Sequence, residues 1–261
     1  MEASAKPLLE CHGLTVRFGG LLALNQLDID VRHGEVLGLI GPNGSGKTTF
    51  LNVISGLYSA SAGSIKFDGV DITTASPQNL FNHGLTRTFQ RSRLCLSLSV
   101  FDNIALGAQK RLNGGLWRNL VRRKSFAAEA RAIAAEAREL LYVFNPGLAD
   151  KLFEPAITLG MIDRRRVEIC RALIGKPKLV MLDEPSAGMT HDETYQVVDE
   201  ILGICKSLGG LTIIIVEHEM GLIERVTDRC VVLNYGKKIC EGRFRDVAAD
   251  PVVREAYLGQ S

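Results

Sequence analysis

The sequence predicts an α/β fold with a parallel sheet core, an antiparallel β subdomain and a helical subdomain, and three features of the chain predict it. Up to about residue 70, short segments of alternating polar and apolar residues are separated by glycine-rich turns, as is typical of β structure. Residues from about 78 to 160 are largely helical in pattern. From about residue 164, strand and helix patterns alternate, which indicates a parallel sheet covered on both faces.

The expected elements follow in order along the chain. Residues 27–31 alternate as a half-buried strand does, and residues 36–40 form an apolar strand before a helix at 48–54. Residues 125–143 are rich in Ala, Glu and Arg, with apolar residues every three or four positions, which predicts a helix. After them we expect helices at 165–174, 191–208 and 220–227, alternating with strands at 178–182, 211–216 and 230–233.

The length of 261 residues fits a single domain of this kind. We expect four parts within it: a β-rich part at about 8–87, a helical subdomain at 88–163, a catalytic core at 164–240 and a C-terminal tail at 241–261. Hydrophobic residues make up 46% of the chain and charged residues 23%, as in ordinary globular proteins. The net charge of +2 argues against a nucleic-acid partner.

Several other classes of protein are excluded by composition. No apolar run reaches the roughly 18 residues of a membrane span, and the N-terminus lacks the apolar core of a secretory signal. The six cysteines are scattered, without a CxxC pair or Cys/His zinc spacing. A secreted disulfide scaffold and a zinc module are therefore disfavoured, and a cytosolic protein is expected.

Residues 41–48 match the phosphate-binding pattern G-x-x-x-x-G-K-[ST] in the setting it requires, after a strand and before a helix. Glycines let backbone N–H groups approach a polyphosphate, and the helix N-terminus adds partial positive charge. Lys47 is placed to bridge the β- and γ-phosphates, and the Thr48 hydroxyl to hold Mg²⁺. The sequence therefore predicts a P-loop NTPase core with a nucleotide site at Gly41, Pro42, Asn43, Gly44, Ser45, Gly46, Lys47, Thr48 and Thr49.

A second motif lies at residues 178–184, where an apolar strand ends in a pair of carboxylates. We expect Asp183 at the sheet edge beside the P-loop, where it holds Mg²⁺ through water. Glu184 follows and is suited to orient or deprotonate an attacking water. The pair therefore predicts hydrolysis of the bound nucleotide.

Two further residues complete an ordered set. Gln90 ends the sequence Arg-Thr-Phe-Gln, and His218 follows the strand at 211–216. The order P-loop, Gln, Asp-Glu, His resembles the nucleotide-binding subunit of ABC transporters over nearly the whole chain. The resemblance implies ATP and Mg²⁺ as cofactors, Thr48, Gln90 and Asp183 at the metal, and His218 at the γ-phosphate. It also implies that Gln90 contacts the attacking water and senses the transmembrane partner, and that Phe18 stacks on adenine.

Finer details are similar to the branched-chain amino-acid importer ATPases. They are residues 18–24, residues 185–189, residues 255–259 and the basic insert before residue 150. Urea and short-amide importers and the lipopolysaccharide-export ATPase are similar too. The resemblance implies a peripheral subunit at the cytoplasmic face of the cell membrane. Its expected partners are permease subunits, a second ATPase subunit and a periplasmic solute-binding protein, and its expected cargo is a branched-chain amino acid or a related small polar or carboxylate solute.

One segment departs from the family pattern. The signature motif, Leu-Ser-Gly-Gly-Gln in the family, falls on residues 159–163, which read Leu-Gly-Met-Ile-Asp. Gly160 lacks the hydroxyl that grips the opposite subunit's γ-phosphate, Ile162 blocks close backbone approach, and Asp163 adds negative charge. Thr190 stands where the family's D-loop aspartate is expected. In a homodimer both nucleotide sites would be weakened, whereas a heterodimer would have one good and one poor site. We favour the heterodimer. Local repacking of residues 159–163 that restores backbone N–H donors is left open.

Other functions remain open at the level of sequence. The divergent signature allows a weakly catalytic regulatory subunit, and the similarity to export ATPases allows an exporter. A P-loop kinase would not need Gln90, Glu184 and His218, and soluble ABC-type ATPases of repair or translation are mostly longer. The six basic residues between 110 and 124 form either a solvated helix or a face near anionic lipid or a permease loop.

Overall fold

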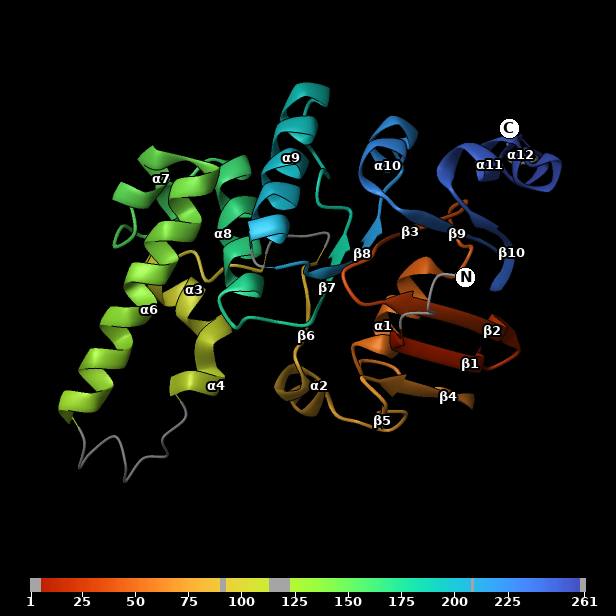
Figure 1. The fold of residues 1–261 in the computed structure, drawn as a ribbon, viewed down its shortest axis with the longest axis horizontal. Helices are drawn as coiled ribbons and strands as arrows, with labels where there is room; N and C mark the ends of the chain where they lie inside the picture. Colours follow the sequence, from red (N-terminus) through yellow and green to blue (C-terminus); the bar gives the residue numbers. More distant parts are fainter. Residues whose placement is uncertain (1–5, 90–92, 113–122, 208, 259–261) are drawn as a thin grey trace. The chain divides into compact units, whose positions relative to one another are not determined.

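The computed structural model describes residues 6–89, 93–112, 123–207 and 209–258 (Figure 1). The chain divides into two compact units. The first unit contains Met1–Arg87, Lys178–Glu184 and Cys205–Ser261, and the second contains Thr88–Pro177 and Pro185–Ile204. Residues 113–122 of the basic insert lie outside the described residues.

A six-stranded sheet in the first unit carries the expected parallel core. Its strands are ordered β10-β9-β3-β8-β7-β6, and all pairs are parallel except the antiparallel pair β9–β10. Every residue of β7 and β8 is buried, which explains why these strands are continuous apolar runs rather than alternating ones. The strand bounds are β3 Val36–Ile40, β6 Leu85–Arg87, β7 Leu179–Asp183, β8 Thr212–Val216, β9 Arg229–Asn234 and β10 Lys237–Gly242.

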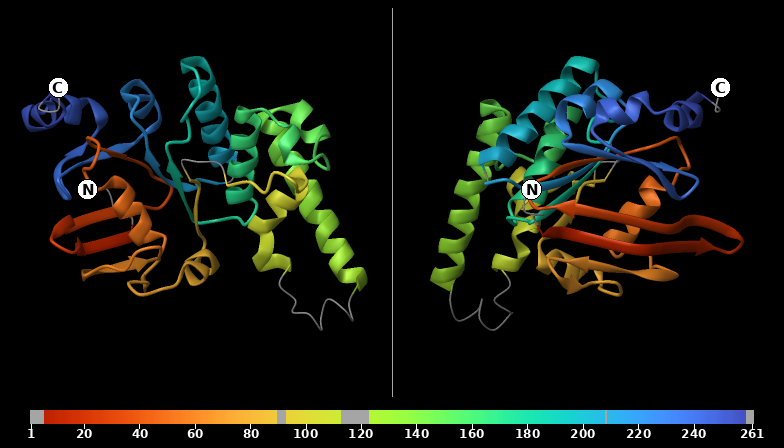
Figure 2. Two further views of the ribbon diagram at one scale, coloured as in Figure 1. Left: turned by 180° about the vertical axis from the view of Figure 1, so that it is seen from behind. Right: turned by 45° about the vertical axis from the view of Figure 1, so that its right-hand side comes forward.

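The antiparallel subdomain is a four-stranded sheet of the same unit, ordered β2-β1-β4-β5. Leu27, Ile29 and Val31 of β2 are buried while Asp28 between them is exposed, as the alternation predicts. Helix α1 (Lys47–Ile54) shares one hydrophobic core with both sheets through Phe50, Leu51 and Ile54, and Figure 2 shows it beside the red strands. The strands are β1 Pro7–Phe18, β2 Leu21–Arg32, β4 Ala62–Phe67 and β5 Val70–Asp71.

The remaining helices of the first unit lie between or after its strands. Helix α2 is capped by Ser76, whose hydroxyl accepts a hydrogen bond from the backbone of Asn79. Two short helices close the chain and bury Val247 and Val253. The bounds are α2 Pro77–His83, α10 Met220–Val226, α11 Phe244–Ala249 and α12 Pro251–Leu258.

The described part of the second unit is helical. The predicted helix at 125–143 is α6 (Arg123–Phe144), and Ile133, Ala137 and Leu141 line its buried face at fourth positions. Helix α8 packs against α3 and α6, so this unit runs past the expected boundary at residue 163 and includes residues assigned to the catalytic core. The other helices are α3 Val100–Ala105, η1 Leu106–Ala108, α4 Gln109–Leu112, α7 Pro146–Asp150, η2 Ala156–Thr158, α8 Met161–Leu173 and α9 His191–Ser207, whose last residues are counted in the first unit.

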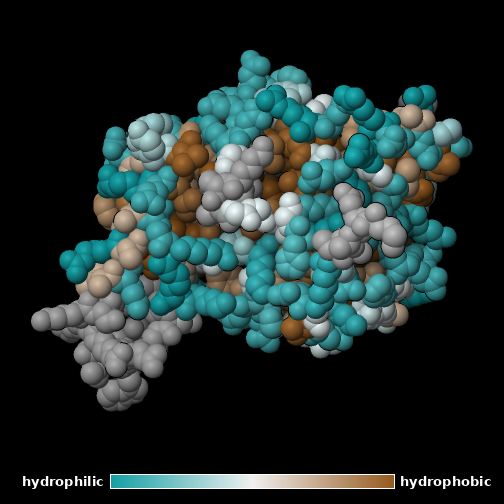
Figure 3. All heavy atoms as spheres, viewed as in Figure 1, coloured by the Kyte–Doolittle hydropathy of each residue, from teal (hydrophilic) through white to brown (hydrophobic). Residues whose placement is uncertain are grey.

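Hydrophilic side chains cover most of the face drawn in Figure 3, and hydrophobic side chains emerge in a few areas. Within the described residues, no helix combines the length and apolar character of a membrane span. The cysteines whose side chains are described, at positions 11, 95, 170, 230 and 240, are free thiols, in agreement with the expectation from their spacing.

Candidate nucleotide-binding site

The P-loop lies between β3 and α1, as its sequence predicts. Gly41, Gly44 and Gly46 have φ values of 147°, 76° and 110°, which residues with a Cβ rarely adopt. A Cβ at Gly46 would stand 2.9 Å from Leu24 Cδ2 and 3.0 Å from the Ala23 carbonyl oxygen. Gly46 is the N-cap of α1 and supplies no side-chain hydrogen bond, so the first-turn amides stay available to an anion.

The Lys47 ammonium rests on the loop itself. Its Nζ donates to the carbonyl oxygens of Gly41 at 2.6 Å and Pro42 at 3.0 Å, and the residue is only 6% exposed. Burial lowers the pKa of Lys47, while the carboxylates of Glu184 and Asp183 act in the opposite direction. The cation is thus held among acceptors that a phosphate can replace.

Asp183 ends β7 and is paired with a residue that the sequence did not single out. Its Oδ2 accepts a hydrogen bond from Arg87 Nη2 at 2.7 Å, with both side chains at most 7% exposed. Arg87 Nη1 donates to Asn52 Oδ1 at 2.7 Å and to Ser55 Oγ at 3.1 Å. Strand β6 pairs with β7 in parallel, so the guanidinium fixes the carboxylate against the end of α1.

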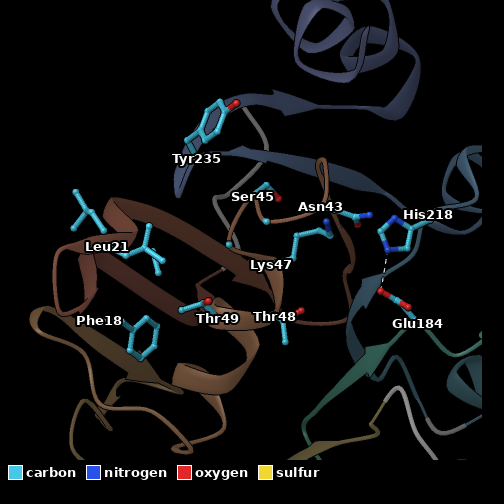
Figure 4. Close-up of a pocket in the computed structure, with 14 residues that line it drawn as sticks. Phe18, Leu21, Asn43, Ser45, Lys47, Thr48, Thr49, Glu184, His218 and Tyr235 are labelled. Carbon is cyan, nitrogen blue, oxygen red and sulfur yellow. Dashed lines mark hydrogen bonds and ion pairs between the residues drawn. The ribbon is translucent and has the colours of Figure 1, made fainter. Parts of the chain in front are cut away.

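Glu184 and His218 come from adjacent strand ends and meet directly. The distance between Glu184 Oε1 and His218 Nε2 is 2.8 Å, and Figure 4 shows the two side chains facing each other. Glu184 has a φ of 46°, and its amide donates to the Val216 carbonyl at 2.9 Å. The two adjacent carboxylates have different partners, Arg87 for Asp183 and His218 for Glu184.

A cavity of about 370 Å³ lies over the P-loop, within the size range of ligand sites. It brings together most of the residues predicted from sequence (Figure 4). Gly41, Pro42 and Asp183 are not among its lining residues, and Gln90 lies outside the described residues. The predicted residues that line it are Phe18, Asn43, Gly44, Ser45, Gly46, Lys47, Thr48, Thr49, Glu184 and His218, joined by Leu21, Leu22, Ala23 and Tyr235.

An aromatic pair stands at the β1 end of this cavity. Phe18 is 46% exposed, and its ring packs edge-on against Tyr58 with centroids 5.3 Å apart. The exposed part of the Phe18 ring is available for stacking, while the contact with Tyr58 limits the ring's rotation. Tyr58 lies in the turn after α1 and belongs to no recognised motif, so no sequence pattern predicts this contact.

In the second unit, helix α8 holds the residues on either side of the Gln90 segment. The buried carboxylate of Glu168 accepts from the Arg93 amide at 2.5 Å and from Arg165 at 3.0 Å. Arg165 also donates to the carbonyl of Phe89 at 2.7 Å, and Arg171 donates to the carbonyl of Arg93 at 2.9 Å. The described neighbours of Gln90 are thereby fixed to α8.

The start of α8 holds the residues that depart from the signature motif of the family. Gly160 is the N-cap and makes no side-chain hydrogen bond, and Met161 is 57% exposed. The Asp163 carboxylate accepts from Arg166 Nη1 at 2.9 Å, so its charge is partly compensated within the unit. Thr190 donates its amide to Glu193 at 2.8 Å, in the manner of a helix cap.

The fold and the site together define a P-loop nucleotide-binding ATPase. Residues 24–187 match the family model described as ABC transporter, and residues 237–261 match the model described as branched-chain amino acid ATP-binding cassette transporter. The chain therefore belongs to the ABC transporter family, as an ATP-binding subunit, and the resemblance inferred from its motifs is confirmed.

Curated relatives match along nearly their whole length. The chain is 34% identical to the high-affinity branched-chain amino acid transport ATP-binding protein LivG of Salmonella typhimurium over 258 residues, covering 98% of this chain and 100% of that protein. It is also 34% identical to BraF of Pseudomonas aeruginosa over 257 residues, with the same coverage. The overall resemblance therefore reaches well beyond the motifs.

Solved structures confirm the fold class. The ADP conformation of MJ1267, an ATP-binding cassette of an ABC transporter, superposes with a TM-score of 0.83 at 30% identity, covering 98% of this chain and 100% of that chain. CbiO1 of Clostridium perfringens, part of the ABC transporter complex cbiONQ, gives 0.78 at 25% identity, covering 98% and 99%. The parallel core, antiparallel subdomain and helical subdomain are thus those of an ABC ATPase.

Proposed function

We propose that this chain drives import of a branched-chain amino acid, or a related small polar or carboxylate solute, from the cytoplasmic face of the membrane. The observation that carries the ATPase part is the Glu184–His218 pair, 2.8 Å apart, in the cavity that also holds Lys47. The names of LivG and BraF support the choice of solute. An exporter of the lipopolysaccharide type is the alternative that transport assays separate.

The chain's own groups account for binding and hydrolysis. P-loop amides and the α1 N-terminus receive the phosphates, and Lys47 exchanges its two carbonyl partners for phosphate oxygens. Glu184 orients the attacking water as general base. His218 holds the Glu184 carboxylate and contacts the γ-phosphate, while the exposed Phe18 ring stacks on adenine.

The oxygen donors near the P-loop fit Mg²⁺. Thr48 offers a hydroxyl and Asp183 a buried carboxylate whose Oδ2 is oriented by Arg87, and Mg²⁺ prefers oxygen ligands, waters and substrate phosphates to an all-protein cage. Among the described residues, no group of three His, Cys, Asp or Glu side chains forms such a cage. The bound ion would neutralise phosphate charge, and Gln90 is proposed as a further ligand.

We assign the chain a second ATPase subunit and two permease subunits as partners, with a periplasmic solute-binding protein in the full complex. The intact P-loop and the divergent residues 159–163 favour a heterodimer. Gly160 brings no hydroxyl, and Ile162 replaces a glycine in the first turn of α8. The partner's signature would then complete this chain's nucleotide site, and the reciprocal site would be poor.

A reconstituted complex tests the transport assignment. The chain is assembled with permease subunits and a second ATPase subunit, and ATP hydrolysis is measured with the solute-binding protein loaded with leucine or with a sugar. We expect leucine to stimulate hydrolysis and to accumulate in vesicles. Stimulation by another solute alone would refute the substrate assignment, and absence of Mg²⁺-dependent ATP binding would refute the ATPase.

Subunit mixing tests the asymmetric dimer. ATP turnover is measured for the isolated chain and for the chain mixed with its partner ATPase, per subunit and at equal total concentration. We expect the mixture to turn over faster, because only there does this chain's P-loop meet an intact signature. Equal rates per subunit would contradict the asymmetry and favour repacking of α8 that restores amide donors.

A further inference from the structure

The turn after α1 carries a tyrosine whose ring contacts the aromatic residue of the nucleotide cavity. Phe18 lines that cavity (Figure 4), whereas Tyr58 is not among its described lining residues. The two rings meet edge to face, with centroids 5.3 Å apart and planes at 76°. Tyr58 therefore touches the Phe18 ring without itself forming part of the cavity wall.

Backbone hydrogen bonds fix the segment that carries Tyr58. The amide of Tyr58 donates to the Asn52 carbonyl of α1 at 3.2 Å. At the other end of the segment, the Ser61 amide donates to the Thr15 carbonyl of β1 at 2.7 Å. The Ser61 hydroxyl accepts from the Arg17 amide at 3.1 Å. The tyrosine is thus held between α1, which begins at the P-loop lysine, and β1, which ends at the cavity phenylalanine.

Phe18 itself stands at a sparsely packed end of β1. It is 46% exposed and precedes Gly19 and Gly20, where an added Cβ would meet no atom within 4 Å. A ring at such a place can turn about its side-chain torsions, and a side chain that is immobilised only on binding costs free energy. The edge-on contact with Tyr58 restricts these rotations before a nucleotide arrives.

We propose that Tyr58 is a positioning residue of the adenine site, whose ring holds the Phe18 ring in the orientation that stacks on the base. The inference rests on the proposed function, in which Phe18 stacks on adenine. Because Tyr58 acts through Phe18, its effect is confined to the base and does not extend to the phosphates. Helix α1 carries the P-loop lysine at its start and the acceptor of the Tyr58 amide near its end, so one rigid element supports both parts of the site.

A double-mutant cycle on the whole chain tests the proposal by isothermal titration with Mg²⁺-ADP and, separately, with Mg²⁺-pyrophosphate, which has no base. Tyr58→Ala should weaken ADP affinity about threefold, less than the loss of Phe18 itself, and leave pyrophosphate affinity unchanged. In the Phe18→Ala background, Tyr58→Ala should cause no further loss. Tyr58→Phe keeps the ring and should bind ADP as the wild type does.

Tyr142→Ala, at a tyrosine 63% exposed on α6, is the matched control and should bind both ligands normally. The melting temperature of Tyr58→Ala without nucleotide should stay close to that of the wild type, because Tyr58 is 44% exposed. Unchanged ADP affinity in Tyr58→Ala, an equal loss for pyrophosphate, or an additive loss in the double variant would each overturn the proposal. If Phe18→Ala leaves ADP affinity unchanged, adenine stacking in the proposed function fails first and this inference falls with it.

Discussion

The nucleotide site of the first unit and the start of α8 in the second unit both correspond to motifs of the ABC family. They differ in how many of the family residues they retain. At the first, the expected residues are present and engaged: Lys47 binds the P-loop carbonyls, Asp183 is paired with Arg87, and Glu184 with His218. At the second, Gly160, Ile162 and Asp163 replace the residues of the pattern, and the aspartate is paired with Arg166.

The two regions are under different structural constraints. A P-loop needs particular backbone geometry, and a side chain at Gly41 would clash, as the 2.1 Å approach of a Cβ there to the Leu233 carbonyl oxygen shows. A helix start needs only amides and a cap, so its side chains can change while the helix persists. Substitutions in the two regions should therefore differ in the size of their effects.

The largest expected effect comes from converting one carboxylate in each region to an amide. Glu184→Gln should lower ATP turnover about 10²- to 10⁴-fold, because the amide cannot accept the proton of the attacking water. Asp163→Asn should change turnover less than about threefold, since only a structural ion pair weakens. Turnover of the complete complex is measured by phosphate release at saturating ATP.

Measurement of ATP affinity is the control for this comparison. Glu184→Gln should bind ATP as tightly as the wild type, because Lys47 and the P-loop amides are unchanged. Comparable losses of turnover in both variants would abolish the contrast between the regions. Wild-type turnover in Glu184→Gln would remove Glu184 from the role of base.

The two regions should also differ in how much an arginine contributes to the free energy of unfolding. Arg87→Met leaves the Asp183 carboxylate buried without its cation and should lower the free energy of unfolding by about 3 kcal/mol. Arg166→Met should cost less, about 1 to 2 kcal/mol, because Asp163 and Glu200 are 23% and 13% exposed and keep access to water. Urea denaturation followed by circular dichroism measures both.

A double variant checks the cause. Adding Asp183→Asn to Arg87→Met removes the uncompensated charge and should restore most of the lost stability. If it does not, packing of the Arg87 stem, rather than its charge, holds the end of β6.

Sequence reasoning succeeded where local pattern and chemistry coincide. The P-loop was found because spacing, preceding strand and following helix all agree, and α6 because Ile133, Ala137 and Leu141 repeat at the helical period. The strands β7 and β8 were readable as apolar runs. The bounds of most expected elements agree with the structure to within two residues.

Residues whose role depends on a neighbour distant in the chain could not be predicted from the sequence. Arg87 lies on a three-residue strand with no pattern of its own, and only the pairing of β6 with β7 brings it to Asp183. Tyr58, in the turn after α1, meets Phe18, at the end of β1, only in the folded chain. The start of α8, at Met161 rather than 165, was missed because Arg164, Arg165 and Arg166 hide the apolar period.

Adenine stacking is a smaller effect at the intact site. Phe18→Ala should weaken ATP affinity about fivefold, the value of an aromatic contact of about 1 kcal/mol, while Phe18→Tyr should leave it unchanged. Removal of Phe153, 64% exposed in the second unit, serves as the matched aromatic control. Equal loss for Phe18→Ala and Phe153→Ala would show that the effect is not local to the nucleotide.

The smallest expected effect is a gain at the divergent region. Gly160→Ser combined with Ile162→Gly restores the family residues at the start of α8, and a Cβ at Gly160 meets no atom within 4 Å. Serine is a favourable N-cap and offsets part of the helix-propensity cost of glycine, about 1 kcal/mol. In the mixed complex, turnover should at most double, because two sites work instead of one. A tenfold gain would mean that the wild-type complex has no good site, and the asymmetric dimer would then be wrong.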